Sequence, residues 1–196
     1  MSEIASPSRC GTLEGMLRTW LFVTLLVGCS RVDGRVPRAG GAVETLADEL
    51  FPYYVAVSST RVCWIRFGDS AVVCRPLAGG ASAVLATEST GIRFLAIDET
   101  DAYWVRKDGA LRKESVAGGT ATTLAAPSGE CTMNADIELD ATHVYWSCGT
   151  SVHKVPKVGG TPTTLFTETG AAELGIAIDA KYVYWTNATT LRRLPK

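Results

Sequence analysis

Three features are scarce in this chain of 196 residues, and each absence narrows its class. Basic and acidic residues nearly balance at 19 and 20, so the basic excess of a nucleic-acid-binding protein is missing. No apolar run reaches the roughly 20 residues of a membrane-spanning helix. Two histidines and no Cys-x-x-Cys pair leave few ligands for a metal ion. We therefore expect no nucleic-acid partner, no metal and no cofactor.

The composition itself predicts a folded domain. Apolar residues make up 46% and charged residues 20%, which a disordered chain would not show. Nineteen glycines and eight prolines, together with many aromatic residues, indicate short strands joined by turns. No stretch shows the apolar spacing of 3.6 residues that would indicate an amphipathic helix.

The N-terminus carries an export signal. Residues 19–28 are uncharged and follow Arg18, which is typical of the apolar region of a signal peptide. Leu26-Val27-Gly28-Cys29 resembles the bacterial lipobox, which implies cleavage before Cys29 and lipidation of its thiol. The alternative is an ordinary signal peptide followed by a structural cysteine.

The lipobox resemblance divides the chain into three parts. We expect a signal peptide over residues 1–28, a lipidated cysteine with a short tether over 29–35, and one domain over 36–196. The acidic start of the chain suggests that translation begins at Met16. Ser30 after the lipidated cysteine implies an outer-membrane lipoprotein of the cell envelope, because aspartate there would favour the inner membrane.

The rest of the chain is a repeat of about forty residues. Trp64, Trp104, Trp146 and Trp185 are separated by 40, 42 and 39 residues. Gly-Gly pairs recur with spacings of 39, 39 and 41. Each unit contains four short stretches rich in β-branched and aromatic residues, and Asp108-Gly109 predicts a hairpin between the second and third. Four strands per unit of this length predict a β-propeller blade.

The phase of the repeat predicts how the propeller closes. The chain opens with an unpaired fourth strand over residues 40–47 and ends on a third strand over 191–196. We expect an all-β propeller of four blades in which the N-terminal strand completes the last blade and protects its edge. The alternative is a truncated gene.

At Tyr184-Trp185-Thr186-Asn187 the repeat resembles the YWTD motif of six-bladed receptor propellers. The longer pattern is similar to propellers of bacterial secreted proteins and lipoproteins. This resemblance covers residues 36–196 and implies the fold more than the function. The aspartate of the motif is replaced by Arg66, Arg106, Cys148 and Asn187, so the ion pairs of that family are not expected here.

Four cysteines remain after Cys29, and an even number in an exported chain indicates disulfides. Cys63 and Cys74 lie symmetrically about Gly68-Asp69, so a hairpin would place them opposite each other. Cys131 and Cys148 would meet at one end of the third blade. We expect the pairs 63–74 and 131–148.

Candidate binding residues lie on the loops that join strands two and three and on those that join successive blades. Such loops form one mouth of a propeller and differ between the repeats, unlike the tyrosine–tryptophan pairs, which we assign to the core. The candidates are Arg66, Asp69, Arg106, Lys107, Asp108, Glu130, Asp136 and Asn187, and the connecting loops add Glu88 and Glu168. The alternative is that these side chains are simply solvated and bind no ligand.

These features predict a membrane-anchored module that binds a protein or a small polar ligand. The alternatives are a propeller enzyme of hydrolase or dehydrogenase type and an inactive fragment. An enzyme needs convergent polar groups on the inner strands, which offer mostly Ala, Val, Ile and Leu apart from Glu138. We expect no catalytic residue, and whether two chains form a homodimer stays open.

Overall fold

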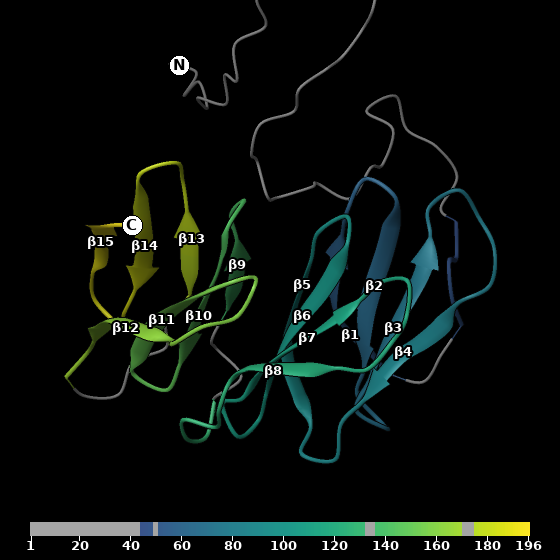
Figure 1. Ribbon diagram of the computed structural model, residues 1–196, viewed down its shortest axis with the longest axis horizontal. Coiled ribbons are helices and arrows are strands. Elements are labelled where there is room, and N and C mark those ends of the chain that lie inside the picture. The colour runs from purple at the N-terminus through teal and green to yellow at the C-terminus, as the bar shows by residue number, and fades with distance from the viewer. Residues whose placement is uncertain (1–43, 49–50, 132–135, 170–174) are drawn as a thin grey trace, which may run out of the picture.

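The structure is a computed structural model that describes residues 44–48, 51–131, 136–169 and 175–196. These residues form fifteen β-strands in four antiparallel sheets (Figure 1) and contain no helix, hence none able to cross a membrane. The predicted all-β fold of four blades is confirmed. The predicted signal peptide, the lipidation site Cys29 and the tether lie outside the described residues.

Each blade is a meander whose strands pair in chain order. The strands are β1 (Pro52–Val57), β2 (Arg61–Arg66), β3 (Ala71–Pro76) and β4 (Ala83–Thr87) in blade 1; β5 (Ile92–Ile97), β6 (Asp101–Arg106), β7 (Leu111–Ser115) and β8 (Thr122–Ala125) in blade 2; β9 (Ile137–Leu139), β10 (His143–Cys148), β11 (Ser151–Pro156) and β12 (Thr163–Thr167) in blade 3; β13 (Ile176–Ile178), β14 (Tyr182–Thr186) and β15 (Leu191–Pro195) in blade 4.

The turn chemistry explains why the strands end where they do. Asp98 Oδ1 accepts hydrogen bonds from the backbone N–H groups of Thr100 and Asp101, which closes the turn between β5 and β6. Asp140 and Asp179 do the same in blades 3 and 4. These three aspartates directly follow the first strand of their blades and cap the turn to the second strand.

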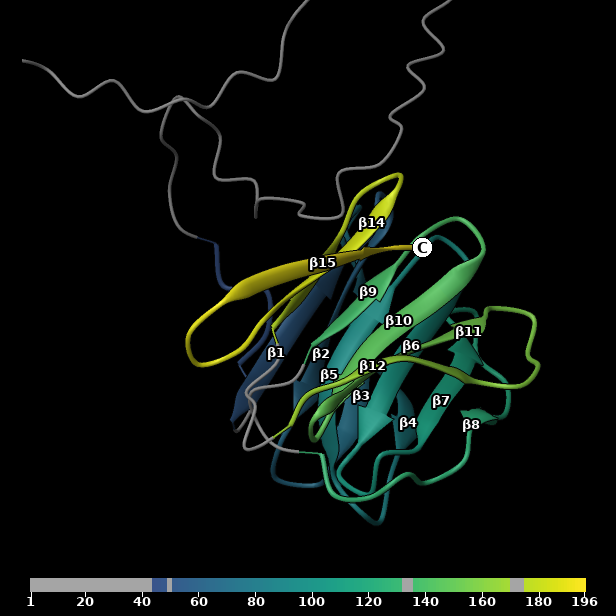
Figure 2. The ribbon, with the colours of Figure 1, turned by 90° about the vertical axis from the view of Figure 1, so that its left-hand side faces the viewer.

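The core lies between the blades. Trp104 and Trp146 are at most 2% exposed, and each packs among aliphatic side chains from its own blade and the preceding one. The sheets therefore follow one another with their faces in contact (Figures 1 and 2). In blades 2 and 3, the second strands, which carry the repeated tryptophans, are deeply buried because both of their faces are covered.

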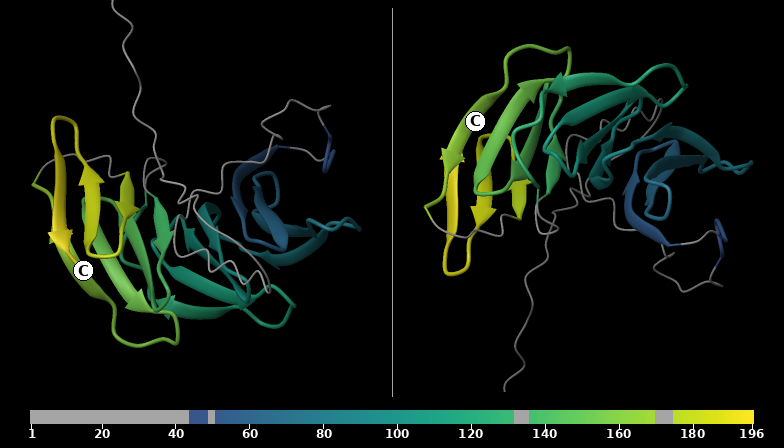
Figure 3. Two further views of the ribbon diagram at one scale, coloured as in Figure 1. Left: turned by 90° about the horizontal axis from the view of Figure 1, so that it is seen from above. Right: turned by 90° about the horizontal axis from the view of Figure 1, so that it is seen from below.

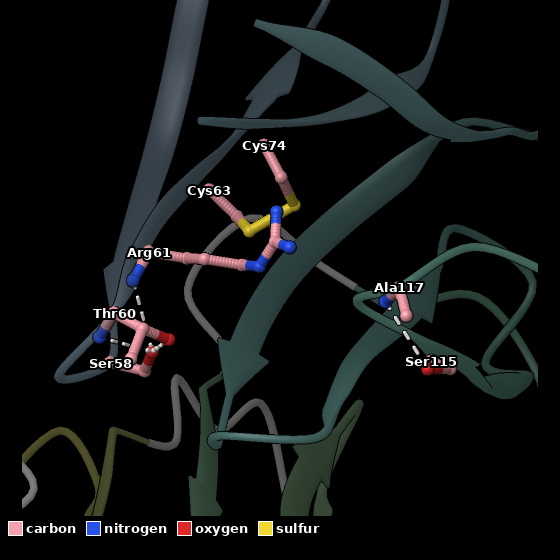
Figure 4. The surroundings of a disulfide bond; sticks show 7 residues. All are labelled: Ser58, Thr60, Arg61, Cys63, Cys74, Ser115 and Ala117. Carbon is pink, nitrogen blue, oxygen red and sulfur yellow. Dashed lines mark hydrogen bonds between the residues drawn. A yellow bond between two sulfur atoms is a disulfide. The ribbon is translucent and has the colours of Figure 1, made fainter. Parts of the chain in front are cut away.

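Both predicted disulfides are confirmed. Cys63 and Cys74 face each other on β2 and β3, and Figure 4 shows the Arg61 side chain extending beside this bond. Cys131 precedes blade 3 and bonds to Cys148 at the end of β10. The second disulfide ties the loop between blades 2 and 3 to the sheet that follows it.

The predicted closure is wrong for the residues that the structure describes. β15 pairs with β14 alone, and residues 44–48 form no strand. Instead, the Leu46 carbonyl accepts a hydrogen bond from Arg75 on β3, and Ala47 packs against the face of blade 1 that contains Val62 and Trp64. The remainder of the predicted strand, residues 40–43, lies outside the described part.

The four blades form a crescent, as Figure 3 shows. The first strands β1, β5, β9 and β13 contact one another in chain order, and no contact of similar extent joins blade 4 to blade 1 within the described residues. A closed ring of four would turn each blade by about a quarter circle from the last. The four described blades do not complete that circle and make an arc.

Candidate functional site

The loops between second and third strands lie at the same end of every blade, and we call this end the hairpin rim. It comprises residues 67–70, 107–110, 149–150 and 187–190, with the loops that enter blades 2, 3 and 4 beside them. The structure therefore brings the predicted binding candidates to one side of the crescent. Most of these side chains, however, form ion pairs or hydrogen bonds within the protein.

Most charges on the hairpin rim pair within their own loop. Arg66 forms a two-pronged ion pair with Asp69, with N–O distances of 2.6 and 2.9 Å, and this pair holds the pKa of Asp69 below its usual value. Arg106 Nη2 lies 2.5 Å from Asp108 Oδ2. These contacts set the shape of the hairpins, because each joins the end of a second strand to the turn that follows it.

Two other rim candidates have different roles. The Asn187 side-chain oxygen accepts hydrogen bonds from the backbone N–H groups of Thr189 and Thr190, so this residue caps its own turn. Lys107 of blade 2 lies 3.4 Å from Glu130 before blade 3, and both side chains are more than half exposed. An ion pair in that setting contributes little stability and is open to competition from a ligand.

Asp136 belongs to the inner wall of the crescent. It accepts a hydrogen bond of 2.6 Å from the Tyr54 hydroxyl of β1, which reaches across blade 2. Burial and the charges of Asp136 and Glu138 raise the pKa of Tyr54. Tyr54 was missed by the sequence analysis because it occupies a bulge, with a φ of 48°, and such a bulge leaves no signature in the repeat.

Glu88 and Glu168 are buried, so their predicted place among the binding residues is wrong. Glu88 accepts a hydrogen bond of 3.0 Å from the Trp104 indole and lies 3.1 and 3.3 Å from the guanidinium nitrogens of Arg112 and Arg106. Glu168 repeats the arrangement with Trp185, at 2.9 Å. Each carboxylate thus joins the end of one blade to the next.

The junction between blades 2 and 3 lacks this carboxylate and has other contacts in its place. Pro127 stands where Glu88 and Glu168 lie in the repeat, and the Trp146 indole nitrogen is buried without a hydrogen-bond partner among the described residues. His153 stacks on Trp146 with ring centroids 5.1 Å apart, and burial lowers the pKa of its imidazole. The Cys131–Cys148 disulfide lies at the same junction and provides a covalent link between the loop and the blade.

A hollow of about 270 Å³ opens on the hairpin rim between blades 1 and 2. Its lining includes Ile65, Phe67, Ser70, Ile92, Arg93 and Lys107. Phe67 is 51% exposed and meets the Tyr53 ring edge-on, with centroids 6.1 Å apart. The hollow thus combines a buried aliphatic floor, an exposed aromatic wall and two cationic side chains.

No group of three or more His, Cys, Asp or Glu side chains with the spacing of a metal site occurs in the part of the chain that the structure describes. Asp98, Asp140 and Asp179 cap turns, and Asp98 and Asp140 also form ion pairs with lysines of the following blade. The hairpin rim thus carries a hollow with apolar and cationic lining, paired charges and exposed loops.

Comparison with known proteins places the fold. No family model and no curated protein matches the sequence. Among solved structures, a chain of the nidogen/laminin complex matches with a TM-score of 0.64 and 16% identity, over 80% of this chain and 64% of that one. The computationally designed Ika4 protein matches with a TM-score of 0.65 and 12% identity, over 79% of this chain and 99% of that one.

These similarities and the repeat define the class. The chain has the fold of a YWTD-like β-propeller, here with four blades. It spans just under two thirds of the nidogen/laminin chain that it matches. At such identities the likeness concerns the fold, so function must be argued from this chain's own residues.

Proposed function

We propose that this chain is a binding module of the bacterial cell envelope, anchored in the outer membrane through lipidated Cys29, and that it holds its partner over the hollow on the hairpin rim. The observation that supports binding is the composition of that hollow. Phe67 exposes half of its ring beside Arg93 and Lys107, above a floor of buried aliphatic side chains. Exposed aromatic side chains next to cationic ones are frequent in recognition surfaces.

The chemistry of the hollow suits a protein segment that presents a carboxylate next to an apolar side chain. The apolar group would cover the Phe67 ring and the aliphatic floor. The carboxylate would lie near Arg93 and the Lys107 ammonium, which is already placed beside the acidic Glu130. Because the Lys107–Glu130 pair is exposed, its replacement by a ligand carboxylate costs little.

The inner wall supports a binding role over a catalytic one. Tyr54 and Asp136 form a polar pair on it, in which the Tyr54 hydroxyl already donates to the carboxylate. With its pKa raised by burial and by both neighbouring carboxylates, Tyr54 stays protonated at neutral pH. A phenol in that state is neither a base nor a nucleophile.

Peptide binding tests the proposal. The probe is a fluorescent pentapeptide of alternating glutamate and phenylalanine, and fluorescence anisotropy reports its affinity for the full chain. We expect Phe67→Ala and Lys107→Gln each to weaken binding about tenfold, which corresponds to about 1.4 kcal/mol. The exposed Lys181, far from the hollow in the sequence, gives the matched control Lys181→Gln, which should leave the affinity unchanged.

The glutamine version of the peptide separates charge from apolar contact. The glutamine peptide should bind the unaltered protein more weakly than the glutamate peptide does. Its affinity should be the same for Lys107→Gln as for the unaltered protein. Equal affinity for both peptides, or variants that bind as the parent does, would contradict the proposed site.

A further inference from the structure

The outer face of blade 4 has the composition of a blade interface but lacks a neighbour in the described chain. Leu191 directly precedes the residue opposite the repeated tryptophan of its blade, as Val72, Leu111 and Val152 do. Those three side chains are fully buried, with an exposed fraction of 0%, whereas Leu191 is 72% exposed. The same position thus points into an interface three times and into solvent once.

The opposite face of blade 1 shows the complementary pattern. Val55 pairs with Trp64 on the first strand of its blade, as Leu95, Ile137 and Ile176 pair with their tryptophans. The three equivalents are between 2% and 5% exposed because each packs on the preceding blade, but Val55 is 63% exposed. Blade 1 therefore presents the second half of an interface whose first half is on blade 4.

The internal interfaces show how these two halves fit. Val72 and Leu95 belong to one apolar cluster between blades 1 and 2, and Val152 and Ile176 belong to another between blades 3 and 4. By this equivalence, a Leu191 side chain would meet a Val55 side chain. Within one chain, blade 1, which contains Val55, and blade 4, which contains Leu191, form opposite ends of the crescent (Figure 3), so the fit requires another molecule.

We propose that a second copy of this chain covers both faces, with blade 4 of each copy packed on blade 1 of the other. A two-fold axis satisfies both contacts at once and closes a ring of two crescents, which leaves no face uncovered. The proposal is independent of the ligand assigned to the hairpin rim.

The edge strand and its charges agree with this arrangement. β15 carries Arg192 and Arg193 and has an unpaired edge in the described chain, whereas every other third strand is covered by a fourth. Residues 44–48, with the exposed acidic side chains Glu44 and Asp48, lie on blade 1, on the face that the partner would cover. The acidic segment of one copy would thus lie beside the basic edge strand of the other and cover it.

Cysteine cross-linking tests the contact. In the full chain carrying Cys10→Ser and Cys29→Ser, the double variant Val55→Cys/Leu191→Cys should form a covalent dimer under mild oxidation. Val55→Cys and Leu191→Cys alone should not, because the contact joins unlike residues. A cross-linked species with the mass of one chain would show that the crescent closes on itself and would overturn the proposal. Absence of any cross-link would overturn it as well.

Solution mass provides the second measurement. By sedimentation equilibrium the full chain should have twice the 20.9 kDa mass of one copy. Leu191→Asp should yield monomers without unfolding, because the side chain is exposed in a single chain. The matched control is Val158→Asp, at a position 95% exposed and outside both faces, which should remain dimeric. A monomeric parent, or a Leu191→Asp variant that stays dimeric, would refute the proposed interface.

Discussion

At the scale of single residues, Gly109 has the tightest surroundings of the glycines that the structure describes on the hairpin rim. The hairpin predicted at Asp108-Gly109 is present, with a loop of residues 107–110 in which Gly109 has a φ of 84°. A Cβ at this position would lie 2.6 Å from the Gly129 carbonyl oxygen and 2.7 Å from Ser128 Oγ. We expect Gly109→Ala to reduce the free energy of unfolding by about 2–3 kcal/mol, measured by urea denaturation.

Gly118 separates strain from steric contact in that experiment. It belongs to the same blade and has a similar φ of 95°, but a Cβ there would meet nothing within 4 Å. Gly118→Ala should therefore cost only the backbone strain, about 1–2 kcal/mol. If both variants reduce the free energy of unfolding by the same amount, the close approach of the two loops at Gly109 does not contribute to stability.

The residue scale also shows what a single sequence with internal repeats reveals. The cysteine pairs were predictable because one pair is symmetric about a hairpin. The burial of Glu88 and Glu168 was not predicted, since a glutamate after a strand is usually exposed. A signal was nevertheless present. The glutamate precedes blades 2 and 4, and in each of these blades an arginine lies opposite the tryptophan. Before blade 3 the glutamate is replaced by Pro127, and His153 lies opposite the tryptophan.

At the scale of elements, lysines join neighbouring blades. Lys157, after β11, lies 2.9 Å from Asp98 in blade 2, and Lys196, after β15, lies 3.0 Å from Asp140 in blade 3. Burial of Asp98 disfavours its charge, but Lys157 and two backbone N–H groups outweigh this effect and lower its pKa to about 2. The turn cap at Asp98 is therefore also a contact between sheets, which the sequence did not reveal because the lysine belongs to another blade.

The lowered pKa makes this contact sensitive to acid. A carboxyl group whose pKa is lower in the folded state stabilises the fold above its unfolded value, near 3.8, and loses this contribution as the pH falls toward 2. We expect Asp98→Asn to lose about 1–2 kcal/mol at pH 7, allowing for solvent at a pair that is partly exposed, and to vary less in stability between pH 4 and 2. Urea denaturation across this pH range measures both effects.

Asp179→Asn is the control for this variant. Asp179 caps the same turn in blade 4, where no blade follows in the described chain. Asparagine keeps the capping oxygen and removes only the charge, and Asp179 has no cross-blade ion pair among the described residues to lose, so Asp179→Asn should destabilise less than Asp98→Asn. Equal effects would mean that the Asp98–Lys157 contact adds nothing to the turn cap.

At the scale of the whole molecule, the number of blades followed from the sequence, but the closure did not. Strand and turn patterns are local, and forty-residue spacing counts the blades directly. Closure depends on the angle between neighbouring sheets, which is set by side chains such as Trp104 and Trp146 packed between them. No pattern within one repeat encodes that angle, so a strand that would complete the last blade was predicted where residues 44–48 instead contact blade 1.

The contact of residues 44–48 with blade 1 limits how far an anchored molecule extends from the membrane. Fourteen residues lie between the predicted lipidation site Cys29 and Glu44, and this stretch spans about 50 Å when fully extended. Cys29→Ser should abolish incorporation of an alkyne-labelled fatty acid and release the protein from the membrane fraction, because a single thiol would carry the diacylglycerol. Cys10→Ser, in the segment that precedes Met16, is the matched control and should keep both the label and the membrane association. Retention of Cys29→Ser in the membrane fraction with its label intact would refute anchoring through this residue.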